Sequence, residues 1–188
     1  MGGVEQEELM KVSREKPWAA VTYAQDFSEE GAALGSQTIL RLQRIVEARN
    51  EGYSIKAIVL AGGIGPETSK YPKQTRPFAK MMEDWLVTEG KFPREVIHCD
   101  VNSWNCIEAT LGMIRLIKEN RLPQNMLVVS TGRHLFPRMW TTWTLLCGGK
   151  KDWSLEFIPE WKGSYDLIHE LAGTVKYIPM SLWYRGKI

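Results

Sequence analysis

Short apolar runs alternate along the chain with longer stretches in which apolar residues recur every three or four positions. Five runs have the length of a single strand, and they cover residues 18–24, 56–61, 95–99, 125–130 and 154–159. The second and fourth runs are almost continuously aliphatic, which is typical of strands covered on both faces in a parallel sheet.

The stretches between the runs have the periodicity of amphipathic helices. The sequence predicts helices at about 36–50, 76–88, 105–120, 136–148 and 165–171. Ser36 is the expected N-cap of the first helix, Ser103 or Asn102 that of the third, and Gly173 the end of the last. Strands that alternate with helices imply right-handed crossovers, so the predicted fold is an α/β, Rossmann-like three-layer sandwich with a mostly parallel sheet of about five strands.

Nothing in the sequence divides the chain into separate domains. It has no internal repeat, no low-complexity tract and no long linker, and its 188 residues, 44% of them hydrophobic, are enough for one sizeable core. We therefore expect a single domain over residues 17–188. Residues 1–16 are polar and acidic, without the apolar segment of a signal peptide, and are predicted to be a frayed or helical leader.

The overall charge is nearly balanced, with 24 basic and 22 acidic residues and a net charge of +2. This composition gives no reason to expect nucleic acid as a partner. No apolar run approaches the roughly 20 residues that cross a bilayer, so no membrane partner is predicted. The three cysteines are an odd number without a CxxC pair, which favours reduced thiols and a cytoplasmic protein. The sequence leaves the oligomeric state open.

Polar and glycine residues follow four of the predicted strands. Asp26 comes after the first strand, Gly62-Gly63 after the second, Asn105 in the segment after the third, and Thr131 directly after the fourth. In an open parallel sheet, ligands bind outside the carboxyl ends of the strands, where loops lead into helix N-termini. We therefore expect these residues to converge on one ligand site.

The glycines after the second strand have two interpretations. Gly62 and Gly63 can offer backbone N–H groups to an anion, or they can simply form a tight strand-to-helix turn. The segment does not match the dinucleotide fingerprint GxGxxG after a first strand, and the chain has no GxxxxGK[ST] phosphate loop. A standard NAD site and a P-loop are therefore excluded, while both interpretations of the glycines stay open.

The segment after the fourth strand carries the sharpest chemical signal, His134 with Arg133 and Arg138. A histidine exchanges protons near neutral pH, and the planar arginine side chain binds phosphate or carboxylate groups. This favours an anion site at which His134 transfers a proton. The alternative is that His134 caps the next helix while the arginines are solvated or pair with carboxylates, and it applies most readily to Arg133.

Other titratable residues carry weaker signals. Cys106 is not favoured as a nucleophile, because nothing close to it in the sequence supplies a base. His98, Cys99 and Cys106 have no recognised zinc-ligand spacing, so no metal site is predicted. His98 lies inside a strand and His169 on a surface-helix pattern, which favours structural roles for both.

Four motifs follow one another in a recognisable order. A helix bearing Arg41 precedes a strand that ends in Ala61-Gly62-Gly63, and the spacing from Leu86 to Ile97 follows. The segment Ser103–Ala109 is similar to Ser-x-Asn-Thr-x-Glu-Asn, and Val129 to Arg138 is similar to Val-Thr-Ser…His…Arg. In this order the motifs resemble the YdcF-like and SanA/ElyC-like domain of unknown function, a bacterial Rossmann-like family, over roughly residues 19–159.

The resemblance implies a small-molecule site on the matching residues, Glu108 among them. It suggests S-adenosylmethionine or a nucleotide as the ligand and leaves the cofactor otherwise unknown. The chain departs from the family pattern at Phe78, Cys106 and Ala109, where the family has glutamate, threonine and asparagine. These departures point to a divergent member that has lost an acid and an amide from the site.

Three functions follow from these observations. The first is an enzyme that acts on a phosphorylated or nucleotide-like anionic substrate, the second a binding module that senses such a ligand without chemistry, and the third a degenerate structural member that binds a protein partner through its tryptophans. Whether the chain is an enzyme is left open. The candidate site consists of His134 for proton transfer, Arg41 and Arg138 for the anion, Gly62 and Gly63 for backbone donation, and Asn105, Glu108, Thr131 and Asp26 as further ligand contacts.

Overall fold

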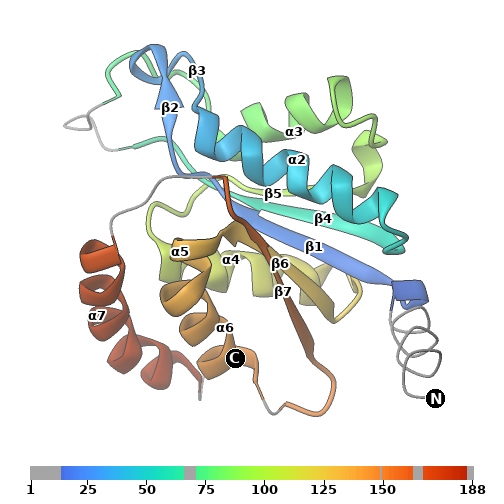
Figure 1. Cartoon of the computed structure of the whole chain (residues 1–188), viewed down its shortest axis with the longest axis vertical. Coiled ribbons are helices and arrows are strands. Elements are labelled where there is room, and N and C mark those ends of the chain that lie inside the picture. The colour runs from blue at the N-terminus through green and yellow to red at the C-terminus, as the bar shows by residue number, and fades with distance from the viewer. Residues whose placement is uncertain (1–13, 66–70, 149, 163–166, 186–188) are drawn as a thin grey trace.

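The sheet has five parallel strands in the order β5-β4-β1-β6-β7 (Figure 1). The computed structural model of the chain describes residues 14–65, 71–148, 150–162 and 167–185. Most of the predicted leader lies outside the described residues. The strands are β1 (Trp18–Tyr23), β4 (Ile55–Ala61), β5 (Ile97–Asp100), β6 (Asn125–Thr131) and β7 (Ser154–Glu160). All four neighbouring pairs are parallel, as the aliphatic runs predicted.

Helices cover both faces of the sheet and complete three layers (Figure 1). One face carries α2 (Ser36–Asn50) and α3 (Phe78–Thr88), and the other carries α4 (Cys106–Glu119) and α6 (Trp140–Cys147), with α7 (Leu167–Arg185) packed against α6. The chain starts in the middle of the sheet, builds outward to β5, and then crosses to β6 on the other side of β1. The order of the strands therefore reverses between β1 and β6, the kind of place where ligands bind in such sheets.

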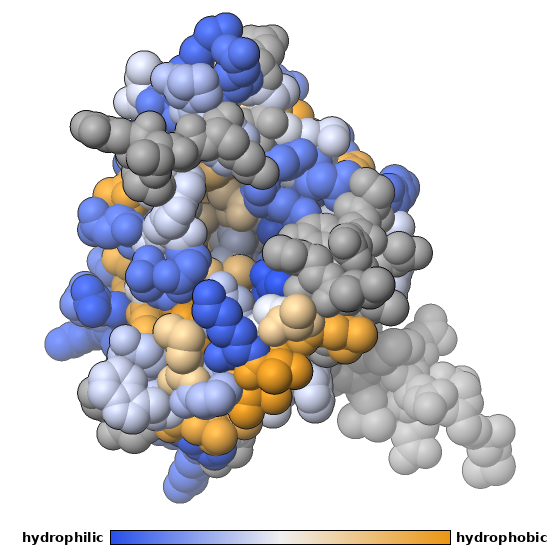
Figure 2. Space-filling model, turned by 90° about the vertical axis from the view of Figure 1, so that its left-hand side faces the viewer, coloured by the Kyte–Doolittle hydropathy of each residue, from blue (hydrophilic) through white to orange (hydrophobic). Residues whose placement is uncertain are grey.

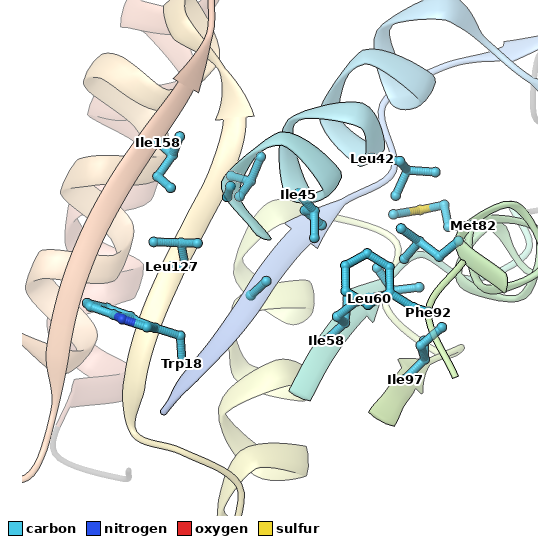
Figure 3. Close-up of a cluster of buried hydrophobic side chains, with 14 of the residues drawn as sticks. Trp18, Leu42, Ile45, Ile58, Leu60, Met82, Phe92, Ile97, Leu127 and Ile158 are labelled. Atoms are coloured by element: carbon cyan, nitrogen blue, oxygen red, sulfur yellow. The ribbon is translucent and has the colours of Figure 1, made fainter. Parts of the chain in front are cut away.

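The core consists of two apolar clusters, one on each face of the sheet. Alternate residues of β1 point to opposite faces, so that Trp18 and Ala20 join one cluster while Val21 joins the other. Figure 3 shows the first cluster, in which Leu42 and Ile45 of α2 lie over the strands. The parallel sheet with helices on both faces confirms the predicted α/β sandwich. Strands that are buried on both faces need such helical cover.

Local details differ from the prediction at several element ends. A small hairpin of β2 (Phe27–Ser28) and β3 (Ala33–Leu34), joined by η1 (Glu29–Gly31), precedes α2. A 3-10 turn, η2 (Arg94–Val96), takes the place of the first part of the third predicted strand. The helix expected from residue 136 starts earlier and is broken into α5 (Gly132–His134), η3 (Leu135–Met139) and α6. Phe136 has an extended backbone (φ −116°, ψ 116°) because it precedes a proline, which disfavours the helical conformation.

The last helix does not end at Gly173. Helix α7 continues through Gly173 and Pro179 to Arg185. A Cβ atom at Gly173 would lie 1.9 Å from Nη2 of Arg138, so the glycine makes room for the arginine side chain. The space that the Arg138 side chain needs explains the glycine at this position, which does not end the helix. None of the described helices is long and apolar enough to cross a bilayer.

Candidate functional site

A pocket of about 310 Å³ lies at the carboxyl edge of the sheet, beside β1 and β4. Figure 2 shows this side of the molecule, with a hollow near the middle of the face. The lining is aromatic and polar, and none of the described lining residues is charged: they are Tyr23, Ala24, Gln25, Ala61, Gly62, Gly63, Tyr71, Phe78, Ser103, Trp104, Asn105, Cys106, Ala109 and Tyr177. Segments that follow β1, β4 and β5 thus converge on one cavity, whereas the segment after β6, which was also predicted to contribute, is not among the described lining residues.

Gly62 and Gly63 form a tight turn and do not offer free backbone donors. The N–H of Gly62 donates to the carbonyl of Asp100 (3.0 Å), and that of Gly63 donates to the carbonyl of Ser103 (2.8 Å). Gly62 has φ +155°, and a Cβ atom there would lie 2.6 Å from Cβ of Phe78. The predicted donation of both N–H groups to an anion is therefore wrong, although both glycines line the pocket.

Arg41 is fully buried beneath the pocket and organises the groups around it. Its Nη1 donates to the carbonyl of Tyr23 (3.0 Å) and its Nη2 to Oε1 of Gln25. The same Nη2 lies 3.2 Å from both Oγ1 of Thr131 and Nδ1 of His134. The structure therefore brings together three predicted site residues, but Arg41 and Thr131 lie behind the lining and not on it.

The hydrogen bonds of His134 fix its tautomer. Arginine has donors only, so Nδ1 of His134 must accept from Arg41, and the Ser130 hydroxyl donates to the same nitrogen (2.8 Å). The ring proton is therefore on Nε2, which lies 3.7 Å from Sγ of Cys106. His134 is thus a hydrogen-bond donor to the sulfur and cannot accept the thiol proton in this arrangement.

Cys106 lines the pocket. His134 is not a lining residue, but it contacts the pocket wall through its hydrogen bond to the sulfur of Cys106. Nothing in the sequence indicates this contact, because the two residues are 28 positions apart and come from different elements. Burial raises the pKa of the Cys106 thiol, and the nearby positive charges of Arg138 and Arg41 oppose the shift without cancelling it. The side chain is therefore a thiol in contact with the ligand space, not a preformed thiolate.

Arg138 is held inside the protein by an acidic partner. Its Nε lies 3.0 Å from Oε2 of Glu170 on α7, and both side chains are buried. Its guanidinium also lies over the ring of Tyr177, 5.6 Å from the ring centre. The sequence predicted that Arg138 holds a ligand anion, but the carboxylate it binds in this structure belongs to the chain itself.

Asp26 caps helix α2 and does not line the pocket. Its carboxylate accepts hydrogen bonds from the N–H groups of Gln37 (3.2 Å) and Thr38 (2.8 Å) and from the Thr38 hydroxyl (2.9 Å). The N-cap position is Gly35, not Ser36, and makes no side-chain cap of its own. An acid at a helix N-terminus stabilises the helix, so the structure gives Asp26 a structural role.

Asn105 and Glu108 cap helix α4. Oδ1 of Asn105 accepts from the N–H groups of Ile107 (3.1 Å) and Glu108 (3.0 Å), so Asn105 is the N-cap in place of the predicted Ser103 or Asn102. The Glu108 carboxylate accepts from the N–H of Trp104 (3.1 Å) and is exposed outside the pocket lining. Asn105 lines the pocket, whereas Glu108, which was also predicted as a site residue, does not.

Ser103 lines the pocket, whereas its position in the sequence predicts a helix cap. It is 5% exposed, and its Oγ is buried without a hydrogen-bond partner among the described residues. Its signal in the sequence is weak, since a serine before a helix is ordinarily a cap. A partnerless buried hydroxyl on a cavity wall points to a ligand that would satisfy it.

The remaining candidates lie away from the pocket or outside the described side chains. His98 is partly buried on β5, where desolvation lowers its pKa, and it does not line the pocket. The side chains of Arg133 and His169 are not among those described. Within the described residues, no three His, Cys, Asp or Glu side chains are placed to hold a metal ion.

Fold and site together define an α/β protein with a Rossmann-like sandwich and a pocket at the carboxyl edge of its sheet. No model of a known protein family matches the chain, and no curated protein is similar to it in sequence.

Proposed function

We propose that the chain binds a small nucleotide-like ligand, with an aromatic ring and acceptor-rich anionic groups, in the pocket beside β1 and β4. The observation that carries the proposal is the hydroxyl of Ser103, which is buried on the pocket wall without a described hydrogen-bond partner. Such a hydroxyl costs free energy, and an acceptor atom of a ligand placed beside it would remove that cost.

The amide side chains of the pocket are donors as well. Oε1 of Gln25 accepts from Arg41 and from the Thr131 hydroxyl, and Oδ1 of Asn105 accepts from two backbone N–H groups. Each amide therefore has only its NH₂ group left for a ligand. With the Ser103 hydroxyl, three donors meet the cavity, which favours a ligand with phosphate, carboxylate or nucleobase acceptors.

The walls of the pocket suit a planar ring. Tyr71 and Phe78 pack edge to face with ring centres 6.1 Å apart, and Trp104 and Tyr177 add further aromatic surface. Aromatic side chains bind planar rings by stacking and edge contacts. The volume of about 310 Å³ lies at the lower end of the range typical of small-molecule sites, roughly 300–1,000 Å³.

Arg41 supplies the preference for negative charge from behind the lining. Its guanidinium is buried and holds Gln25, a lining residue, through the amide oxygen. A positive charge in a low-dielectric interior acts over several ångströms, so it favours an anionic group near Gln25. The same charge disfavours the sulfonium of S-adenosylmethionine, which makes nucleotides and phosphate esters the better candidates.

Two versions of this function differ in whether the ligand is converted. In the enzyme version, the Nε2–H of His134 stays on the neutral ring and assists as a hydrogen-bond donor behind Cys106, while a proton that the reaction needs comes from the ligand or from water. In the binding version, the same residues only hold the ligand. The described lining contains no carboxylate that could accept a proton, which favours the binding version. As part of the proposal, the chain is a divergent member of the YdcF-like family, whose order of motifs its own motifs resemble.

Thermal unfolding with a panel of ligands tests the proposal. AMP, ADP, ATP, S-adenosylmethionine and simple phosphate esters are each added to the full chain, and the melting temperature is recorded. A ligand at 100 times its Kd contributes about 2.7 kcal/mol, which corresponds to a rise of roughly 5–11 °C for a protein of this size. A panel without any shift would refute the proposal and leave the structural member as the better interpretation.

Gln25→Glu separates the donor argument from general damage to the protein. The carboxylate would keep a bond to Arg41 but would present an acceptor oxygen, and no donor, to the ligand. We expect an unchanged melting temperature without ligand and a loss of the ligand-induced shift. Trp161→Ala, an exposed residue outside the pocket, is the control and should keep the shift. Chromatography of the incubated ligand then distinguishes the two versions, since only the enzyme converts it.

A further inference from the structure

Helix α7 has an inverted distribution of polar and apolar side chains. Among the α7 side chains that the structure describes, residues 170–185, the buried ones are polar, namely Glu170, Thr174 and Ser181. Its exposed positions are mostly apolar, namely Leu171, Val175, Ile178, Met180, Leu182 and Trp183. A surface helix normally buries its apolar face, so an exposed apolar face of this extent indicates a surface that something else covers.

The apolar residues form one continuous stripe. Leu171, Val175, Ile178 and Leu182 follow at intervals of four, three and four residues, which places them on one side of the helix. Val175 is 71% exposed and Leu182 is 52% exposed. Figure 2 shows an apolar band across the lower half of the face on which α7 lies, below the hollow of the pocket.

The exposed charges on the described part of this helix have a single sign, since its acidic residue Glu170 is buried. From Leu171 to Arg185 the sequence contains no acidic residue, and the two charged residues are Lys176 and Arg185. Both are exposed. At the end of the helix, Trp183 packs edge to face against Tyr184 with ring centres 4.7 Å apart. Basic residues beside an apolar stripe, with aromatic rings at one end, suit the interface between an anionic lipid surface and water.

We propose that the exposed face of α7 docks in the plane of an anionic phospholipid bilayer. The stripe of four aliphatic residues and Trp183 enters the acyl boundary, while Lys176 contacts the lipid phosphates. Other interfacial helices turn their polar face to water. In α7 the polar face, with Thr174 and Ser181, packs against the rest of the protein.

A second copy of the chain fits this face less well. Burying a whole Val, Leu or Ile side chain removes roughly 60–120 Å² from water, so the partly exposed stripe offers only on the order of 100–250 Å². A stable protein interface needs about 800 Å² from each partner. A helix pair across the stripe would also place basic residues of both copies near each other, and Glu170 of α7 could not neutralise them because it is buried against Arg138.

The sequence predicted no membrane partner because it contains no run long enough to span a bilayer. That criterion does not detect a helix that lies in the interface, since such a helix needs only one apolar face. The exposed fractions of the α7 side chains supply what the sequence pattern could not: they show which side of the helix is left uncovered.

Flotation with lipid vesicles tests the docking of the full chain. We expect the protein to float with mixed phosphatidylcholine and phosphatidylglycerol vesicles, and to stay unbound with phosphatidylcholine alone. Raising the salt to about 1 M, where the Debye length is about 3 Å, should weaken binding to the mixed vesicles. Equal binding to both vesicle types, or binding to neither, would overturn the proposal.

Substitutions on the exposed face locate the contact. Val175→Gln with Leu182→Gln should reduce the partition coefficient at least tenfold, and Lys176→Glu should reduce it roughly tenfold. Because these side chains are exposed, the melting temperature should stay unchanged, which separates lost docking from misfolding. Ile64→Gln, at 51% exposure in the loop after β4, is the matched control and should bind as the wild type does. Undiminished binding of the α7 variants, or a dimer in solution that the same variants dissociate, would refute the lipid partner.

Discussion

Replacing Ser103 or Ser130 by alanine should change the free energy of unfolding in opposite directions. Both serines are buried, at 5% and 0% exposure. Oγ of Ser103 has no described partner, whereas Oγ of Ser130 donates to Nδ1 of His134 at 2.8 Å. Replacing either serine by alanine removes one buried hydroxyl. The free energy of unfolding should therefore rise in Ser103→Ala and fall in Ser130→Ala.

The magnitudes follow from the cost of an unsatisfied polar group and the net value of a hydrogen bond. A buried group without a partner costs about 1–3 kcal/mol, so Ser103→Ala should gain on the order of 1 kcal/mol. Ser130→Ala loses one hydrogen bond, at a cost of about 1 kcal/mol. For a protein of this length, 1 kcal/mol corresponds to about 2–4 °C, so the melting temperatures of the two variants should differ by roughly 4–8 °C.

Denaturant and thermal unfolding of the unliganded variants measure this difference directly. Ser154→Ala, at an exposed position at the start of β7, is the control and should stay within about 0.5 kcal/mol of the wild type. With a nucleotide that binds, Ser103→Ala should also raise Kd about fivefold, the value of one lost hydrogen bond. If Ser103→Ala destabilises the protein as much as Ser130→Ala does, its hydroxyl has a partner and the argument for the ligand fails.

Three further outcomes test other parts of the structure. Asp26→Ala should lower the free energy of unfolding by about 0.5–2 kcal/mol through loss of the α2 cap, and ligand binding should be kept at saturating concentration; lost binding would restore Asp26 as a ligand contact. Glu170→Gln should destabilise by about 3–5 kcal/mol, because it leaves the buried Arg138 cation without its carboxylate, and a change below 1 kcal/mol in urea unfolding would contradict the buried ion pair. Burial raises the pKa of Cys99 and of Cys147 from 9.0 to about 12, so between pH 9 and 12 these thiols ionise in the unfolded chain before they do in the folded one. The free energy of unfolding should therefore fall with rising pH over that range. A flat profile would show that both thiols are accessible to water.

The fold was predictable because its strands are buried on both faces. The aliphatic runs that became β4 and β6 leave no polar side to face water, and only a covered parallel sheet accepts them. The ends of elements were less predictable, since they depend on contacts that are distant in sequence. Gly173 has the residue type of a helix stop, yet it lies mid-helix. A glycine fits there because the side chain of Arg138 occupies the place that a Cβ atom would take.

The convergence of the site was also predictable, but the state of each polar group was not. Parallel strands bring their carboxyl ends to one edge, so Thr131 and His134 were expected near Arg41. The sequence cannot show which hydrogen-bonding atoms are already used by other parts of the chain. The N–H groups of Gly62 and Gly63 are taken by carbonyls at the end of β5 and in the segment after it, so residue type alone could not decide between a tight turn and donors to an anion.

The same reasoning explains why neither Arg41 on α2 nor Arg138 after β6 lines the pocket. A buried guanidinium must be partnered in a low-dielectric interior, and the fold satisfies this demand internally with Glu170 for Arg138 and with Gln25 for Arg41. Arg41 thereby fixes the orientation of Gln25. Because the amide oxygen of Gln25 is bound to Arg41, only its NH₂ group can face the cavity. The pocket would therefore choose its ligand by neutral donors backed by a distant charge. Because neutral donors reject any partner that lacks an acceptor, this arrangement discriminates between ligands by the position of their acceptors more than by their net charge.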